Sequence, residues 1–217
     1  TEDKIKIIFN GVDLEKFNPE NANRNKLRKE LNIAENEILI GMTGRFSRGK
    51  GHEEFLFAAN QLSKKFSYLK FVFVGEASHG EDEYANSVKQ LALNYRLKNV
   101  YFTGFRSDIP DVLAAMDIFV FPSHSESFGI ALIEAMAMFK PSVCSNSEGV
   151  LDIAVDNETS NLFKVKDGND LAKNLGQLIL DPEKCKTFGN NARKRVGEFF
   201  NLEKVTERII DVYSKLI

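Results

Sequence analysis

Short apolar runs alternate with longer amphipathic runs along this 217-residue chain, and this alternation constrains its fold more than any other feature. Several of the short runs are apolar on both faces, which is typical of parallel strands covered by helices on both sides. The pattern predicts an α/β protein with a Rossmann-like, doubly wound parallel sheet and C-terminal helices, in one domain spanning residues 1–217. Strands are expected at 5–9, 38–43, 70–74, 100–103, 118–121, 142–145 and 161–165, and helices at 53–66, 83–95, 109–116, 131–138, 171–180, 183–199 and 202–217.

The segment 126–134 lies between an expected strand and an expected helix, where a doubly wound sheet binds its ligand. Glu126 and Glu134 bracket the start of the helix, whose free N–H groups bind anions such as phosphate. Gly129 has no side chain and allows a phosphate to approach the backbone closely. Glu134 lies about 7 Å along the helix, where its two oxygens can accept hydrogen bonds from a ribose diol. Glu126 would then face the sugar end of a nucleotide sugar. The alternative is that Glu126 is a solvated loop acid and Glu134 an exposed helix residue.

A second loop, residues 44–51, follows the expected strand 38–43 and reads G-x-x-x-x-G-K-G. A P-loop needs Ser or Thr after the lysine to hold magnesium, and Gly51 has no hydroxyl. The position of the loop still suits a phosphate, and Arg45 and Lys50 are candidates to neutralise a diphosphate. The alternative is a basic surface turn. Both loops together favour one shared anion site.

The bulk composition and the remaining motifs exclude several classes of protein. A formal net charge of -2 indicates no general attraction to nucleic acid or to an anionic membrane, and no apolar run is long enough to span a bilayer. Cys144 and Cys185 form no paired metal motif, and a cytoplasmic protein with free thiols is the simplest interpretation. The chain has neither a G-x-G-x-x-G after a strand nor a G-x-S-x-G, so neither a nicotinamide site nor a serine hydrolase is indicated. His124, close to Glu126, is a candidate to line the pocket, although a loop histidine is more often only exposed.

Taken together, these residues resemble the C-terminal, donor-binding domain of the group 1 (family four) retaining glycosyltransferases, which have the GT-B fold. The resemblance covers nearly the whole chain. It rests on Asn10-Gly11-Val12-Asp13 with Phe17 and Pro19, Gly44-Arg45-Phe46, Lys50-Gly51, Val74-Gly75, Phe102-Thr103-Gly104-Phe105, and the E-x7-E segment from Glu126 to Glu134 with Pro122-Ser123 before it and Ala135-Met136-Ala137 after it.

The resemblance implies a role for each candidate residue. Glu126, as the catalytic-site acid, would hold hydroxyls of the transferred sugar, and Glu134 the ribose diol. Arg45 and Lys50, beside Gly44, would bind the diphosphate. The loop at Phe105 and Arg106 would flank the base. Backbone amides near four further residues would hold phosphate or sugar: Phe128, Gly129, Ile130 and Ala131.

The resemblance also implies the reaction. Such an enzyme transfers a hexosyl group from a nucleotide sugar, here with UDP preferred, to a glycan or glycolipid with retention of configuration. It needs no metal and no further cofactor, since the cations and the helix start stabilise the departing diphosphate. Members carry an N-terminal acceptor domain before the segment that begins here. The isolated chain is therefore expected to bind nucleotide but to transfer little sugar, with a peripheral membrane contact left open for the full enzyme.

Departures from the family pattern keep two other interpretations open. Phe139 stands where the family usually has Gly. The segment 147–152, which ends at Asp152, stands where the family usually has a glycine-rich acidic loop. These changes motivate a non-catalytic nucleotide-binding or interaction module of the same fold. The loop 44–51 motivates a P-loop-like phosphohydrolase, which would leave the E-x7-E segment unexplained.

Overall fold

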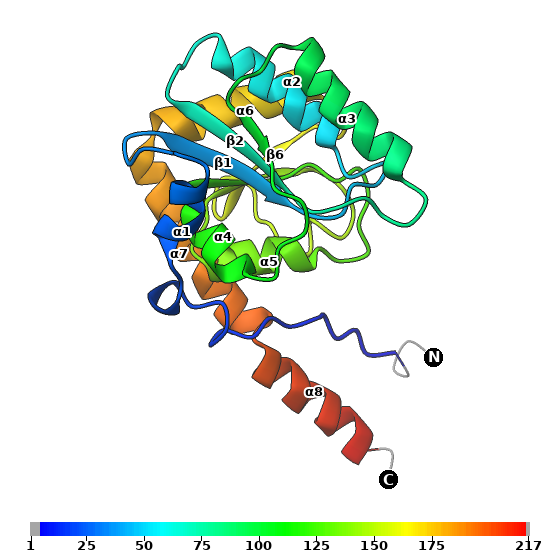
Figure 1. Cartoon of the computed structure of the whole chain (residues 1–217). Coiled ribbons are helices and arrows are strands. Elements are labelled where there is room, and N and C mark those ends of the chain that lie inside the picture. Colours follow the sequence, from blue (N-terminus) through cyan, green and yellow to red (C-terminus); the bar gives the residue numbers. More distant parts are fainter. Residues whose placement is uncertain (1–4, 216–217) are drawn as a thin grey trace.

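A computed structural model describes residues 5–215, and its centre is one six-stranded parallel sheet (Figure 1). The strand order β3-β2-β1-β4-β5-β6 confirms the predicted doubly wound, Rossmann-like sheet. The order reverses between β1 and β4, and a ligand is expected outside the carboxyl ends of the strands at this point. The strands are β1 (Ile38–Thr43), β2 (Leu69–Val74), β3 (Val100–Phe102), β4 (Ile118–Phe121), β5 (Ser142–Ser145) and β6 (Ser160–Phe163).

All the expected helices are present, most with ends shifted by one to three residues. The polar segment 24–30 also forms a helix, which the periodicity did not predict; Asn23 caps it, and only Leu27 and Arg28 are buried. Residues 216–217 of the expected final helix lie outside the described residues. The helices are η2 (Pro19–Asn21), α1 (Arg24–Glu30), α2 (His52–Ser63), α3 (Asp82–Asn94), α4 (Ile109–Ala115), α5 (Ile130–Ala137), α6 (Gly168–Leu180), α7 (Pro182–Phe199) and α8 (Leu202–Ser214). Among the helices of residues 5–215, none combines the length and the hydropathy that a membrane-spanning segment requires.

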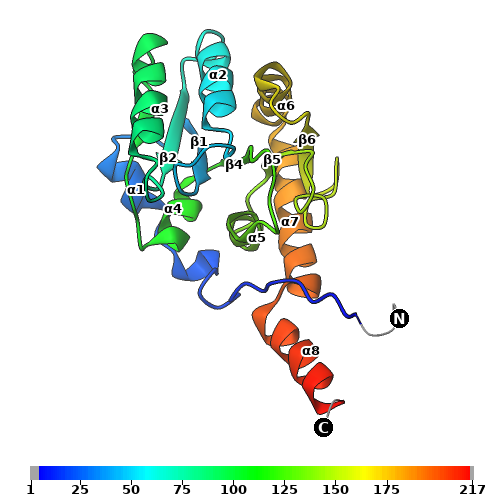
Figure 2. The same ribbon diagram turned by 90° about the vertical axis from the view of Figure 1, so that its right-hand side faces the viewer.

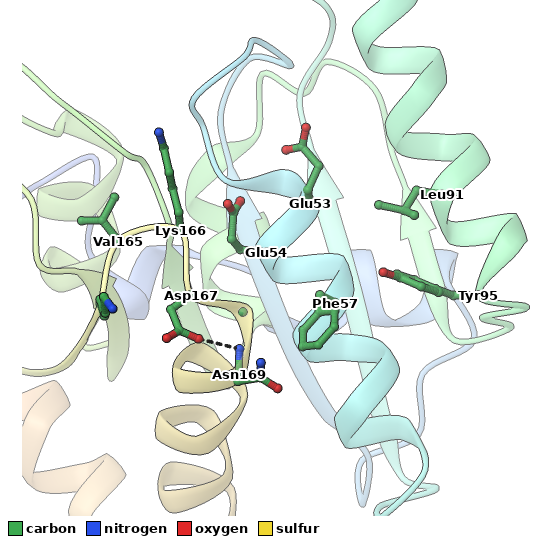
Figure 3. Close-up of a pocket in the computed structure, with 11 residues that line it drawn as sticks. Glu53, Glu54, Phe57, Leu91, Tyr95, Val165, Lys166, Asp167 and Asn169 are labelled. Atoms are coloured by element: carbon green, nitrogen blue, oxygen red, sulfur yellow. Dashed lines mark hydrogen bonds between the residues drawn. The ribbon is translucent and has the colours of Figure 1, made fainter.

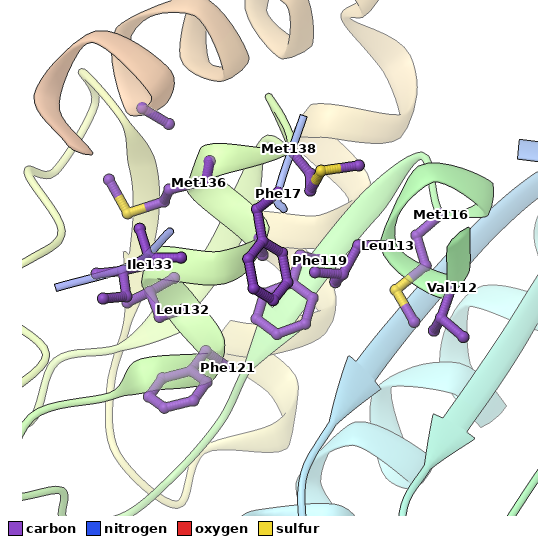
Figure 4. Packing of buried hydrophobic residues seen from close by; sticks show 14 of the residues in the cluster. Phe17, Val112, Leu113, Met116, Phe119, Phe121, Leu132, Ile133, Met136 and Met138 are labelled. Atoms are coloured by element: carbon purple, nitrogen blue, oxygen red, sulfur yellow. The ribbon is translucent and has the colours of Figure 1, made fainter. Parts of the chain in front are cut away.

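The helices cover both faces of the sheet, and two separate cores result (Figures 1 and 2). One core lies between the sheet and helices α2, α3 and α6, and the other between the sheet and helices α1, α4 and α5. Successive strand residues point to opposite faces, so Phe71 and Phe73 enter the first core while Val72 and Val74 enter the second. The second core includes Phe119, packed among side chains of α4 and α5 (Figure 4).

The expected strand at residues 5–9 is wrong. The segment is irregular and lies outside the sheet, with Ile5 and Ile7 76% and 77% exposed. Its chain runs beside α8, where Lys6 pairs with Asp211 at 3.3 Å. The nearest strand-like pairing is a single bridge at Val12, where the chain meets the connection between α7 and α8. The Val12 N–H donates to the Phe200 carbonyl, and the Val12 carbonyl accepts from the Leu202 N–H. An apolar alternation needs a sheet edge to become a strand, and none is beside this segment.

Phe139 occupies a backbone position that favours glycine. Its φ is 57°, directly after α5. The Lys140 N–H bonds the Ala135 carbonyl and the Phe139 N–H bonds the Met136 carbonyl, each at 3.1 Å, which is the Schellman ending of a helix. An L-residue with a side chain costs about 1–2 kcal/mol in this conformation. The departure from the family's usual glycine therefore affects a helix end, and Phe139 lies outside the cavities that the candidate site residues line.

Candidate functional site

The two loops singled out in the sequence meet at the carboxyl ends of β1 and β4, where they enclose a cavity of about 490 Å³. Nine of the eleven candidate residues line it. Loop 44–51 contributes three of them, and the other six come from the loop before α5 and from α5 itself. These residues are Gly44, Arg45, Lys50, Glu126, Phe128, Gly129, Ile130, Ala131 and Glu134.

A second cavity, of about 390 Å³, adjoins the first and extends toward β2 and the loop after β3. Phe105 and Arg106, the two remaining candidates, line it. Glu134 and Arg45 line both cavities. The site is therefore an elongated cleft with Glu126 at one end, Glu134 at the junction and Phe105 at the other end.

The start of α5 opens into this cleft without a side-chain cap. Gly129 is the N-cap residue, as predicted, with φ 118°, and it provides no oxygen for the first N–H groups of the helix. Ile130 and Ala131, the first two helical residues, line the cavity. N–H groups at such a position have no intrahelical partner and carry the positive end of the helix dipole. The cleft therefore offers an anion-binding helix start between Glu126 and Glu134.

The two cations that line the first cavity, Arg45 and Lys50, differ in what they contact. Lys50 Nζ lies 2.5 Å from Glu126 Oε1, and the two side chains are only 30% and 15% exposed. Arg45 is exposed and forms no ion pair with any residue between 5 and 215. Before any ligand binds, Lys50 is thus neutralised inside the protein, whereas the Arg45 guanidinium is available.

Glu134 is a partly buried carboxyl on the inner face of α5. Burial raises its pKa to about 7, and the positive charge of Lys16 opposes part of this shift. The group therefore titrates near neutral pH, and a ligand that donates hydrogen bonds to it would favour the ionised form.

The guanidinium of Arg106 is held by carboxylates of the protein. It donates to Asp108 at 2.7 and 2.8 Å and to Glu30 at 2.6 and 3.2 Å. The Arg106 guanidinium, bonded to the Asp108 carboxylate, holds the pKa of Asp108 well below its usual range. Arg106 lines the second cavity, but its charge is already paired, whereas the Phe105 ring is 70% exposed.

The histidines do not line the cleft. His124 Nε2 lies 3.0 Å from Glu54 Oε1 of α2, so the candidate role of His124 in lining the pocket is wrong. Glu54 in turn lines a separate cavity of about 500 Å³ between α2, α3 and the start of α6 (Figure 3). None of the eleven candidate residues lines that cavity. His52 is buried against the Phe46 ring, and burial lowers its pKa to about 4, which keeps it neutral.

Among the cleft residues that were not predicted as site residues are two polar ones, Asn10 and Thr43. Asn10 lines the first cavity from the N-terminal segment. Thr43, the last residue of β1, lines both cavities, and its buried Oγ1 has no hydrogen-bond partner among the described residues. A polar residue at the carboxyl end of an apolar strand is a signal that the sequence contains. For Asn10 no local pattern indicates a site, because only the packing of residues 9–12 brings it there.

The described residues, 5–215, contain no group of three or more His, Cys, Asp or Glu side chains placed to hold a metal ion. Gly51 is the N-cap residue of α2, with φ 77°, and its place in the loop offers no hydroxyl for magnesium.

Comparisons with known proteins point to one family. The family model for group 1 glycosyl transferases matches residues 23–195. The capsular polysaccharide biosynthesis glycosyltransferase CapM of Staphylococcus aureus is 29% identical over 223 residues, which cover 100% of this chain and 57% of that protein. The chain spans about half the length of the curated relatives it matches.

Solved structures share the fold over almost the whole chain. The crystal structure of HepE of Anabaena with UDP and glucose matches with a TM-score of 0.90 at 28% identity. The match covers 99% of this chain and 58% of the HepE chain. The C-terminal domain of the group 1 family protein LpcC from Francisella tularensis has a TM-score of 0.79 at 30% identity, covering 88% of this chain and 100% of that domain. A domain of this kind has thus been crystallised by itself.

Proposed function

The chain belongs to the group 1 glycosyltransferases, and on this premise we propose that it binds the nucleotide-sugar donor of a retaining hexosyltransferase. The observation that carries the proposal is the order of groups along the cleft: Glu126, the uncapped start of α5, Glu134, then the exposed Phe105. A nucleotide sugar has the matching order of sugar, diphosphate, ribose and base. UDP is the proposed nucleotide, supported by the UDP-bound structure of HepE.

Each part of the donor has a matching group in the cleft. The diphosphate would lie against the N–H groups at the start of α5, with Arg45 and Lys50 as its counter-ions. Glu134 would accept hydrogen bonds from the ribose diol, and Glu126 from hydroxyls of the sugar. Phe105 and the backbone beside it would flank the base, because the Arg106 guanidinium is already bound to Glu30 and Asp108.

The proposed chemistry is stabilisation of the leaving diphosphate. Negative charge increases on the diphosphate as its bond to the sugar breaks, and fixed cations and backbone N–H groups at that place lower the barrier. We propose that these groups suffice without a metal ion. The proposed acceptor, a glycan or glycolipid, would be bound by a part of the protein other than this chain; the relative CapM is a glycosyltransferase of capsular polysaccharide biosynthesis.

Calorimetric titration with UDP, GDP and ADP, without added metal, tests the proposal. We expect saturable binding of UDP, weakened about tenfold or more by Arg45→Ala or Glu134→Ala. Arg48→Ala is the matched control: it removes a cation from the same loop, but Arg48 is 78% exposed and lines neither cavity. Equal losses in Arg45→Ala and Arg48→Ala, or no binding of any diphosphate, would contradict the proposed site.

UDP affinity is expected to rise with pH through about 7, because the ribose diol favours ionised Glu134. A protonated Glu134 has one oxygen that donates, whereas the ionised form accepts at both. With a pKa of about 7, ionisation changes about tenfold between about pH 6 and about pH 8, and the Glu134-dependent part of the affinity should follow it. The Glu134→Gln variant has no carboxyl group to titrate at this position, while the phosphate groups of UDP titrate as they do with the wild type. If both proteins had the same pH profile by calorimetry, Glu134 would not be the titrating group.

A further inference from the structure

Given the proposed function, on which this inference rests, we propose that the Lys50–Glu126 ion pair makes the site prefer a nucleotide sugar over the free nucleoside diphosphate. In the free protein the Lys50 ammonium group is paired with the Glu126 carboxylate. Glu126 therefore competes with the terminal phosphate of the ligand for this ammonium group. The pair acts as a specificity determinant for the intact donor and against the product that remains after transfer.

The geometry of the pair supports competition. The Lys50 ammonium lies 2.5 Å from a Glu126 oxygen, and both side chains are mostly buried in the cavity wall. Arg45 on the same wall has no ion pair with any described residue, so it can meet a phosphate directly. Lys50 can do so only if it leaves Glu126 or shares its protons between the carboxylate and the phosphate. An ionised carboxylate accepts hydrogen bonds and cannot donate them, so Glu126 needs a new donor if Lys50 leaves it.

The intact donor and the free diphosphate differ in whether they supply that donor. Sugar hydroxyls next to the diphosphate can donate to Glu126 and replace the bond to Lys50. A free diphosphate has only acceptor oxygens and negative charge at that end, so Glu126 would be left buried and unpaired beside an anion. A buried polar group without a partner carries a large desolvation cost. The ion pair therefore weakens product binding more than donor binding, which favours product release.

The experiment is a double-mutant cycle on the whole chain with two ligands. Titrations with UDP, and with the tightest-binding of UDP-glucose, UDP-galactose and UDP-N-acetylglucosamine, are made on wild type, Glu126→Gln, Lys50→Met and the double variant. Glu126→Gln should tighten UDP about tenfold, because Lys50 becomes free, and should weaken the UDP-sugar about threefold. The preference for the sugar over UDP should therefore fall by more than about tenfold.

The Lys50→Met background separates competition from plain charge repulsion. If Glu126 only repelled the phosphate, Glu126→Gln would tighten UDP at least as much without Lys50 as with it. If Glu126 competes for Lys50, the tightening should fall below about threefold in Lys50→Met. Glu158→Gln, which removes an exposed carboxylate without an ion pair among residues 5–215, should leave both affinities unchanged.

Three results would overturn the inference. An unchanged preference in Glu126→Gln, or equal tightening in both backgrounds, contradicts competition while leaving the proposed function intact, provided that Arg45→Ala still weakens UDP. Absence of UDP binding by both wild type and Glu126→Gln overturns the inference and the proposed function together.

Discussion

Gly149→Ala is expected to weaken UDP binding by about a hundredfold and to lower the free energy of unfolding by about 2–4 kcal/mol. Gly149 has φ 75°, and a Cβ there would lie 2.2 Å from the carbonyl oxygen of Glu126 and 3.0 Å from its carbon. Both obstacles are backbone atoms, so no side-chain rotation can relieve the overlap. The loop that carries Glu126, next to the start of α5, has to move, and the cleft loses its geometry.

The matched control for this variant is Gly80→Ala. Gly80 has φ 79°, so alanine meets nearly the same backbone strain of about 1–2 kcal/mol, but no atom lies within 4 Å of the added Cβ. Chemical denaturation measures the strain in both variants, and calorimetry measures UDP binding. We expect Gly80→Ala to bind UDP as wild type does. A folded Gly149→Ala protein with unchanged UDP affinity would show that the Glu126 loop is not held in place by Gly149.

Asp117→Ala is expected to destabilise the fold by about 3–5 kcal/mol, because it leaves a buried charge without a counter-ion. Arg28 is only 3% exposed, and its guanidinium donates to Asp117 Oδ2 at 3.1 Å. The same oxygen accepts from the Leu39 N–H at 2.8 Å, at the start of β1. The carboxylate therefore connects α1 to the central strand, and its removal leaves both donors without this acceptor.

Arg24→Ala tests whether burial causes the large effect. Arg24 binds the other oxygen of Asp117, Oδ1, at 2.6 Å, but its side chain is 44% exposed. An exposed ion pair contributes about 1 kcal/mol or less. Equilibrium urea unfolding of both variants should show the difference. Similar losses in Arg24→Ala and Asp117→Ala would mean that the buried Arg28 does not depend on this carboxylate.

Most of the fold could be predicted because its signals are local. The runs at 38–43, 118–121 and 142–145 form strands with the predicted bounds. Periodicity failed at 5–9, an apolar alternation with no neighbouring sheet edge, and at 24–30, a polar helix stabilised by the Asn23 cap and the buried Arg28. The outcome at 5–9 depended on contacts with distant segments, and so does the burial of Arg28 beside Asp117, whereas the Asn23 cap is a local signal.

The candidate site was also predictable in outline. Both phosphate-type loops follow strands, and parallel strands bring their carboxyl ends to one edge of a sheet, so a shared site could be expected from the residue pattern alone. The side-chain contacts within the site could not be predicted. Lys50 and Glu126 are 76 residues apart, and Arg106 is bound by Glu30, a residue 76 positions away on a helix that the periodicity did not indicate.

The sequence by itself determined the class of fold, the two loops and the residue types of an anion site, because periodicity, glycines and charges act over a few neighbouring residues. Only the tertiary structure decided the strand order that joins β1 to β4, the pairing of Lys50 with Glu126 and the burial that moves the pKa of Glu134 toward neutrality. These properties depend on which distant segments pack together, and electrostatic energies change steeply with burial and with separations of a few ångströms.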